Sequence, residues 1–175
     1  MEVLLRHGAD VTLRDEKLLT PLHLVSSEGK VDSMELLIQY GADVNARDKD
    51  DSTPLHLALS NWPTDPMRVL VQHGADVTAR DKSRLTPLHL ASSMGNVDSI
   101  ELLIKHGADV DARDKNHLTP LHLASSVGEE ASPMRLLIHH GADVNAQNKN
   151  NSTPLHLLML RVSAEFAVIH PVFQH

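Results

Sequence analysis

The chain has 175 residues, and its formal charge of −7 comes from 16 basic and 23 acidic residues. This charge speaks against general nucleic-acid binding, which depends on neutralising phosphates. The absence of cysteine excludes disulfides and thiol chemistry and fits a reducing compartment. No apolar segment is long enough to span a membrane. The apolar stretch at the N-terminus is too short for a secretion signal, and charged residues interrupt it early. We therefore expect an intracellular, cytoplasmic protein with no membrane contact.

Two short phrases recur along the chain in a fixed phase. TPLHL begins at Thr20, Thr53, Thr86, Thr119 and Thr153, and GADV begins at Gly8, Gly41, Gly74, Gly107 and Gly141. The successive copies of each phrase are 33, 33, 33 and 34 residues apart. Two phrases in one register indicate a single supersecondary unit that is copied along a line.

The first 14 residues correspond to the end of such a unit. Residues 1–11 align with 34–44, so a second helix and a GADV phrase are present, whereas the first helix of that unit is missing. Helical solenoids normally close their ends with polar caps. We expect the chain to be a fragment, or an incomplete gene model, of a longer array; the alternative is that a lone helix suffices as a cap.

The next unit, 15–47, predicts two helices. Thr20 is suited to the N-cap of the first helix and Pro21 to its first turn, and Gly29 can end it. Apolar residues at helical spacing predict a second helix over 31–39. Gly41 lies just past its end, where a residue with a left-handed backbone commonly ends a helix. Neither helix can bury its apolar face alone, so neighbouring units must cover one another.

Three further units span 48–80, 81–113 and 114–147, and together the units form a single domain over 1–175. The last unit, 148–175, keeps TPLHL and then loses the pattern. Residues 163–170 are expected to form a degenerate second helix that Pro171 ends. We expect this tail to fold back onto the last unit, because its apolar residues need cover.

A unit of this length with TPLH and two helices resembles the ankyrin repeat, and the resemblance covers residues 1 to about 158. It implies an all-α solenoid of paired antiparallel helices with protruding β-hairpin or loop fingers. It also implies that a protein partner binds to the finger tips and to the exposed, concave face of the first helices. We use the name fingers for residues 14–19, 47–52, 80–85, 113–118 and 147–152.

Transferring this binding surface by position gives a set of candidate contact residues. On the fingers they are Lys17, Leu19, Arg47, Lys49, Asp50, Ser52, Arg80, Lys82, Ser83, Arg84, Leu85, Arg113, Lys115, Asn116 and Leu118; on the first helices they are Ser60, Asn61, Ser93 and Met94. These positions vary between copies, whereas the TPLHL frame does not.

Every finger departs from the family pattern at its fourth hairpin position, which is usually glycine. Leu18, Asp51, Arg84, His117 and Asn151 occupy it. Asp and Asn tolerate a left-handed backbone, whereas Leu and Arg adopt it at some cost. Either the turn adopts another conformation or the tips were altered for contact.

The five fingers hold ten basic and seven acidic residues, a net charge of +3, so the remainder of the chain carries −10. The third to fifth fingers alone contribute +4. We therefore expect an acidic or phosphorylated segment on the partner. The alternative is that each Arg-Asp-Lys run is a self-neutralising, solvated turn.

No catalytic, metal or cofactor site is predicted. The histidines of TPLHL recur in strict register, which favours a structural role, and no catalytic or nucleotide-binding motif is present. We expect a non-catalytic scaffold, either monomeric or with weak end-to-end association. The alternative is a structural spacer, part of a longer array that regulates a separate effector domain.

Overall fold

The computed structural model describes residues 1–59, 65–127 and 131–169, with side chains as far as residue 163. Its described residues form helices, turns and loops and include no strand, which confirms the all-α prediction. The helices in this described part of the chain are α1 (Glu2–Arg6), α2 (Pro21–Ser27), α3 (Val31–Gln39), α4 (Pro54–Ala58), α5 (Asp65–Gln72), α6 (Pro87–Ser93), α7 (Val97–Lys105), α8 (Pro120–Ser125), α9 (Ser132–His139) and α10 (Pro154–Ile169).

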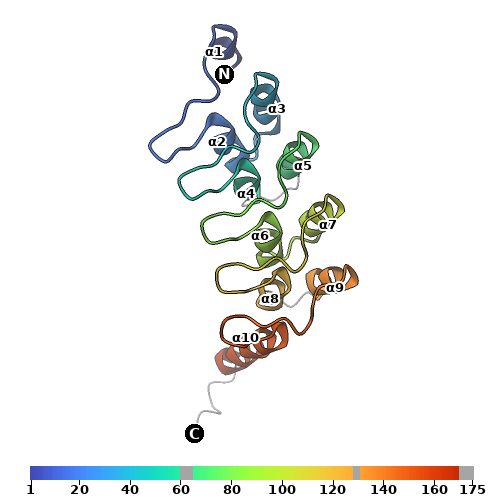
Figure 1. The fold of residues 1–175 in the computed structure, drawn as a ribbon. Coiled ribbons are helices and arrows are strands. Elements are labelled where there is room, and N and C mark those ends of the chain that lie inside the picture. Colours follow the sequence, from blue (N-terminus) through green and yellow to red (C-terminus); the bar gives the residue numbers. More distant parts are fainter. Residues whose placement is uncertain (60–64, 128–130, 170–175) are drawn as a thin grey trace.

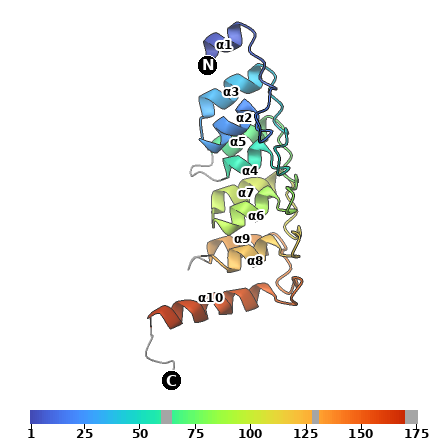
Figure 2. The ribbon, with the colours of Figure 1, turned by 90° about the vertical axis from the view of Figure 1, so that its left-hand side faces the viewer.

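The helices form an elongated stack of two columns. The first helices α2, α4, α6, α8 and α10 follow one another, and α3, α5, α7 and α9 lie beside them (Figure 1). The fingers project from one edge of the stack, and α1 and α10 lie at its opposite ends (Figure 2). Successive units therefore contact their neighbours and share no central core, as expected for a solenoid.

Each first helix begins as the sequence predicts. Thr20 has an extended backbone, with φ −86° and ψ 163°, and its hydroxyl accepts the backbone N–H of His23 at the start of α2. Pro21 follows in the first turn, where the missing N–H has no cost. The same arrangement recurs at Thr86 and Thr119.

Buried apolar side chains run along the length of the stack and hold the helices of successive units together. In the unit of α2 and α3, Leu22, Met34 and Leu37 are buried, and the corresponding residues of the next units join them in one cluster. Each side chain of this kind is worth about 1.5–3 kcal/mol when it is removed from water. Burial between neighbouring units therefore stabilises helices that are too short to persist alone.

The end of the stack differs from the prediction. A second helix was expected to fold back after residue 163, but α10 continues without a break to Ile169. Val162 stands in α10 at the position of Gly29, whose φ of +69° turns the chain after α2. Valine strongly disfavours that conformation, so the helix continues. The expected stop at Pro171 lies outside the described residues.

The fingers are turns and loops. Neighbouring fingers are joined by one backbone hydrogen bond each, for example from Lys49 N–H to the Lys17 carbonyl at 2.9 Å and from Lys82 N–H to the Asp50 carbonyl at 2.9 Å. One bond per pair is too few to make a ladder between strands. It is nevertheless repeated along the whole row, so the fingers are held in register.

All five residues at the fourth hairpin position have a left-handed backbone. Their φ values are 60° at Leu18, 59° at Asp51, 61° at Arg84, 61° at His117 and 57° at Asn151. The alternative that the turn adopts another conformation is therefore wrong. The fingers keep the turn that glycine would favour and accept the steric cost of a side chain.

Glycine at residue 18 should stabilise the protein. We expect Leu18→Gly to raise the free energy of unfolding by about 0.5–1 kcal/mol, because relief of the left-handed strain exceeds the added entropy of the unfolded chain. Urea denaturation measures this change. Asn151→Gly is the matched control and should change stability less, since asparagine tolerates this conformation. An equal or smaller gain at residue 18 would contradict the assignment of strain.

Candidate protein-binding face

Each finger is built around one carboxylate or amide that binds the backbone of its own turn. Asp81 Oδ1 accepts the N–H groups of Ser83 and Leu85, both at 2.8 Å. Asp15, Asp48, Asp114 and Asn148 accept the two equivalent N–H groups in their own fingers. The turn is thereby fixed by the side chain at its base, and the residues between are left to face solvent.

The TPLHL histidines attach each first helix to the next finger. Nδ1 of His89 accepts the backbone N–H of Thr86 at 3.2 Å, and Nε2 donates to the Leu118 carbonyl at 3.1 Å. Nε2 of His23, His56 and His122 lies 3.2, 3.2 and 3.0 Å from the carbonyls of Ser52, Leu85 and Ser152. The structural role predicted for these histidines is present at all four junctions.

The environment of these four histidines favours the neutral ring. Burial lowers the pKa of His23, His56, His89 and His122 below the ordinary value of 6.5, and the carbonyl that accepts the Nε2 hydrogen opposes this shift. Because Nδ1 must accept an N–H group, a second proton on the ring would remove that hydrogen bond.

The arginines predicted as contact residues bind the neighbouring finger. Arg47 Nη1 donates to the Arg80 carbonyl at 2.8 Å, and Arg80 Nη1 to the Arg113 carbonyl at 3.3 Å. Arg14 and Arg113 make the equivalent bonds, to the carbonyls of Arg47 and Gln147. These guanidinium groups therefore have a structural role, which the sequence analysis missed because the acceptor lies a full unit away in the chain.

A row of exposed lysines lies along the same edge. Lys49, Lys82, Lys115 and Lys149 occupy equivalent positions on successive fingers, and all four are exposed. Among the residues that the structure describes, no finger lysine forms an ion pair with a carboxylate. The finger carboxylates Asp15, Asp48, Asp81 and Asp114 instead bind backbone N–H groups. We call these four lysines the lysine row.

One hollow brings four of the predicted residues together. It has a volume of about 500 Å³ between the first two fingers and is lined by Lys17, Leu19, Asp48, Lys49, Asp50 and Leu57. Leu57 belongs to α4 and was not predicted; its position in a first helix was the available signal. The predicted residues of the third and fourth fingers do not line this hollow. They lie on the later fingers, further along the stack.

The other candidate contact residues differ in their exposure to solvent. Leu19, Ser52, Leu85 and Leu118 are half-buried beneath the finger tips, whereas Ser83, Arg84 and Asn116 are exposed. In α6, Ser93 is half-buried and its hydroxyl donates to the Leu90 carbonyl at 2.8 Å, and the half-buried Met94 is the C-cap. Ser60 and Asn61 lie outside the described residues.

A further junction contact was not predicted. Asn45 Nδ2 donates to the Gly74 carbonyl at 3.2 Å, and Asn45 Oδ1 accepts the N–H of Asp76 at 2.8 Å. Asp111 accepts the N–H of Asp143 at the equivalent place. Asn45 and Asp111 each follow a GADV phrase and link consecutive loops, whereas Thr12 and Thr78 at the same position bind Asp10 and Asp76 of their own loops.

Within the described part of the chain, no cluster of three or more His, Asp or Glu side chains is arranged to hold a metal ion. None of the helices described combines the length and the apolar character that a membrane crossing requires.

The comparison with protein families agrees with this architecture. A family model described as ankyrin repeats (3 copies) matches residues 1–81, 48–114 and 88–167. No curated protein matches the chain in sequence. Ankyrin repeats generally mediate interactions between proteins, and the family is typically non-catalytic. Because the matches cover nearly the whole length and the structure is a stack of paired helices, the chain belongs to the ankyrin repeat family.

Proposed function

We propose that this protein is a non-catalytic scaffold that binds an acidic or phosphorylated segment of a protein partner along its finger edge. The proposal rests above all on the lysine row. Its lysines are exposed on successive fingers, and the carboxylates of Asp48, Asp81 and Asp114 are engaged by backbone N–H groups, while Asp50 and Asp51 follow Lys49 in the second finger. A row of like charges at regular spacing favours an extended anionic segment over a single compact ion.

This arrangement weakens the alternative of a self-neutralising turn. The carboxylates still lower the local potential, but they make no contact ion pair with the finger lysines among the described residues. The positive charge of Lys49, Lys115 and Lys149 thus remains available to a ligand. Lys82 Nζ donates to the carbonyl of Lys49, and this hydrogen bond keeps its positive charge near the edge.

The hollow between the first two fingers suggests where an apolar side chain of the partner binds. Leu19 and Leu57 line it together with Lys17 and Lys49. An apolar residue of the partner can be buried there while flanking acidic residues face the lysines. Such a buried anchor within a polar rim is typical of binding hot spots.

Charge reversal on the third and fourth fingers tests the proposal. A partner is first identified by proximity labelling, and its affinity is then measured for Lys82→Glu, Arg84→Glu and Lys115→Glu combined. We expect at least about a tenfold loss of affinity and a flatter dependence on salt, because the variant replaces attraction with repulsion.

The matched control reverses Lys30, Lys105 and Arg135, which are exposed outside the fingers. This variant has the same net charge as the finger variant, so it separates local contacts from the general effect of charge. Its affinity should stay within about twofold of the original protein. Equal losses in both variants, or no loss in either, would contradict a site on the finger edge.

A further inference from the structure

The backbone N–H groups of the finger tips are already bonded within the protein. In the third finger, all five N–H groups of residues 81–85 are engaged, four of them inside the finger and that of Lys82 at the Asp50 carbonyl. The same scheme holds for residues 48–52, 114–118 and 148–152. A partner strand that adds to an edge binds through unpaired main-chain groups. The fingers therefore recognise a ligand through their side chains.

Backbone hydrogen bonds also set the distance at which the fingers repeat. The Asp81 N–H donates to the Leu85 carbonyl across one finger at 3.0 Å, and the Lys82 N–H donates to the Asp50 carbonyl of the preceding finger at 2.9 Å. Backbone segments joined in this way lie about 4.8 Å apart. Because each finger contributes two such segments, the lysine row repeats at about 9.6 Å. The usual separation of packed helices, about 8–10 Å, agrees with this value.

This repeat distance discriminates between the conformations that a partner segment can adopt. A polyproline II helix has three residues per turn and rises about 3.1 Å per residue, so every third side chain returns to the same side after about 9.3 Å. The corresponding distance is about 6.8 Å for every second residue of a β-strand and about 10.5 Å for every seventh residue of an α-helix. Across the four lysines the polyproline II helix departs from the row by about 1 Å, and the α-helix departs by about 3 Å.

The lysine row supplies one exposed ammonium group per finger for such a segment. Lys82 Nζ donates one hydrogen to the Lys49 carbonyl, and the two other hydrogens of this ammonium remain for a ligand. The guanidinium groups that suit a phosphate best are engaged by carbonyls of the neighbouring fingers, at Arg47, Arg80 and Arg113. Separate ammonium groups of this kind each match a single carboxylate.

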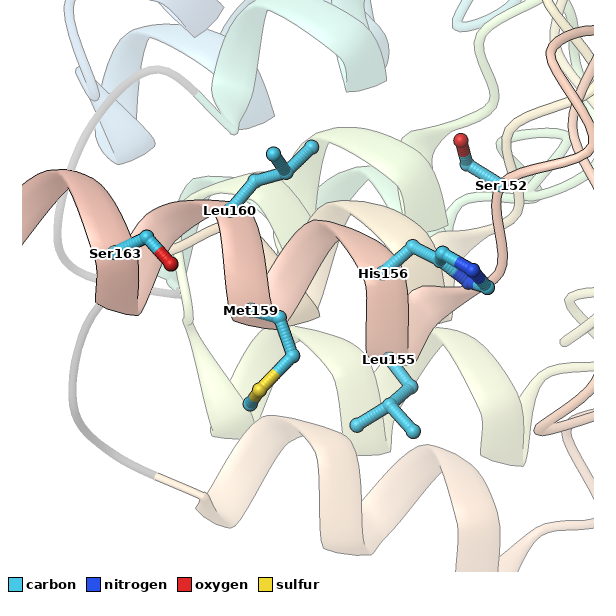
Figure 3. A pocket seen from close by; sticks show the side chains of 6 residues that line it. All are labelled: Ser152, Leu155, His156, Met159, Leu160 and Ser163. Atoms are coloured by element: carbon cyan, nitrogen blue, oxygen red, sulfur yellow. The ribbon is translucent and has the colours of Figure 1, made fainter.

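Two hollows beside the fingers differ in charge. The hollow between the first two fingers includes Lys17 and Lys49 in its lining. A second hollow, of about 400 Å³, lies where the fifth finger leads into α10 and is lined by Ser152, Leu155, His156, Met159, Leu160 and Ser163 (Figure 3). Its lining contains no lysine or arginine, so the acidic residues of a ligand are expected on the fingers and not along α10.

We propose that the partner segment is a polyproline II helix with an acidic side chain at every third residue, one for each lysine of the row. This inference rests on the proposed function and specifies the conformation and the charge spacing of the anionic ligand. A proline-rich segment suits this site, because it adopts the polyproline II conformation before binding and loses less entropy on the fingers. Its recognition requires only side-chain contacts, which the bonded finger backbone permits.

Synthetic peptides of one composition test the spacing. The triplet peptide consists of four copies of Glu-Pro-Pro, and the control peptide has the same residues with its glutamates at every second position. Fluorescence anisotropy of the labelled peptides with the full chain, at low ionic strength, measures both affinities. We expect the triplet peptide to bind at least about fivefold more tightly, because its carboxylates meet the lysines in register.

The substitution Lys115→Ala tests the row itself. The finger of Lys115 contains one carboxylate, Asp114, which binds backbone N–H groups, so the ammonium group of Lys115 has no competing anion in its own finger. Its removal should weaken binding of the triplet peptide about three- to tenfold and should reduce the preference for this peptide over the control peptide. Lys105→Ala is the matched control, because Lys105 is exposed in α7 outside the fingers, and both affinities should stay within about twofold.

The outcomes distinguish this inference from the proposed function. Equal affinities for the two peptides would overturn the triplet spacing and leave an anion-binding finger edge in place. So would tighter binding of a proline peptide that carries a single phosphoserine and no glutamate, since that result assigns the site to one compact anion. Binding of polyglutamate without binding of the triplet peptide also overturns the inference alone. If polyglutamate and all of these peptides fail to bind, the proposed function falls together with it.

Discussion

His89→Ala should reduce the free energy of unfolding by about 3 kcal/mol, whereas His156→Ala should reduce it by less than about 0.5 kcal/mol. The two residues occupy the same position of TPLHL, but only His89 is buried and bonded on both sides. Its removal leaves a cavity, and it leaves the Leu118 carbonyl and the Thr86 N–H without the ring. His156 is exposed, and its Nε2 has no carbonyl partner among the described residues.

Urea denaturation followed by circular dichroism measures both changes, at a concentration low enough to prevent association. A solenoid can lose cooperativity when an inner junction is weakened, so the curves should be fitted with a nearest-neighbour model. We expect the His89 variant to show a broadened transition as well as a lower midpoint. Equal effects of the two substitutions would show that the bond to the next finger contributes little.

The free energy of unfolding should also fall as the pH decreases below 6.5. The pKa of His23, His56, His89 and His122 is lowered in the folded protein, mainly by burial, from the ordinary value of 6.5. The unfolded chain therefore takes up protons first, and each proton bound only by the unfolded chain shifts the equilibrium toward it. The full stability is present above pH 6.5 and is lost progressively toward the folded-state pKa values.

Each of these histidines can contribute a slope of up to about 1.4 kcal/mol per pH unit. All four act in the same direction, so the protein should be less stable near pH 5.5 than near pH 7.5. Denaturation at a series of pH values at constant ionic strength measures the slope. Repeating the series with His89→Gln should reduce the slope, and an unchanged stability across this range would exclude the mechanism.

Much of the fold could be predicted because the local signals agree with one another. The period, the Thr-Pro helix start and the apolar spacing all indicate the same unit, and the predicted helix over 31–39 coincides with α3 (Val31–Gln39). The Thr-Pro start and the apolar spacing act within a few residues of the chain, and the period follows from comparing the copies with one another.

The interactions over longer distances could not be predicted. The arginines were predicted to contact a partner, and the bonds of Arg47 and Arg113 to carbonyls 33 and 34 residues further along were not foreseen. At the other end, the apolar tail suggested a returning helix, but Val162 does not provide the turn that Gly29 provides. The lysines of the candidate face are exposed, whereas Arg47 and Arg113 bind the next finger, and contact of either set with a partner stays a prediction.

The way each finger is anchored has a consequence for how such a protein changes over generations. Because Asp81 and its counterparts secure the loop through main-chain atoms, the outward side chains, apart from the one at the left-handed position, contribute little to folding. Replacements there escape selection for stability and accumulate by drift even when nothing is recognised. Diversity among the loops is therefore the default outcome of this architecture, and selection for a ligand would instead be visible as restraint at those sites.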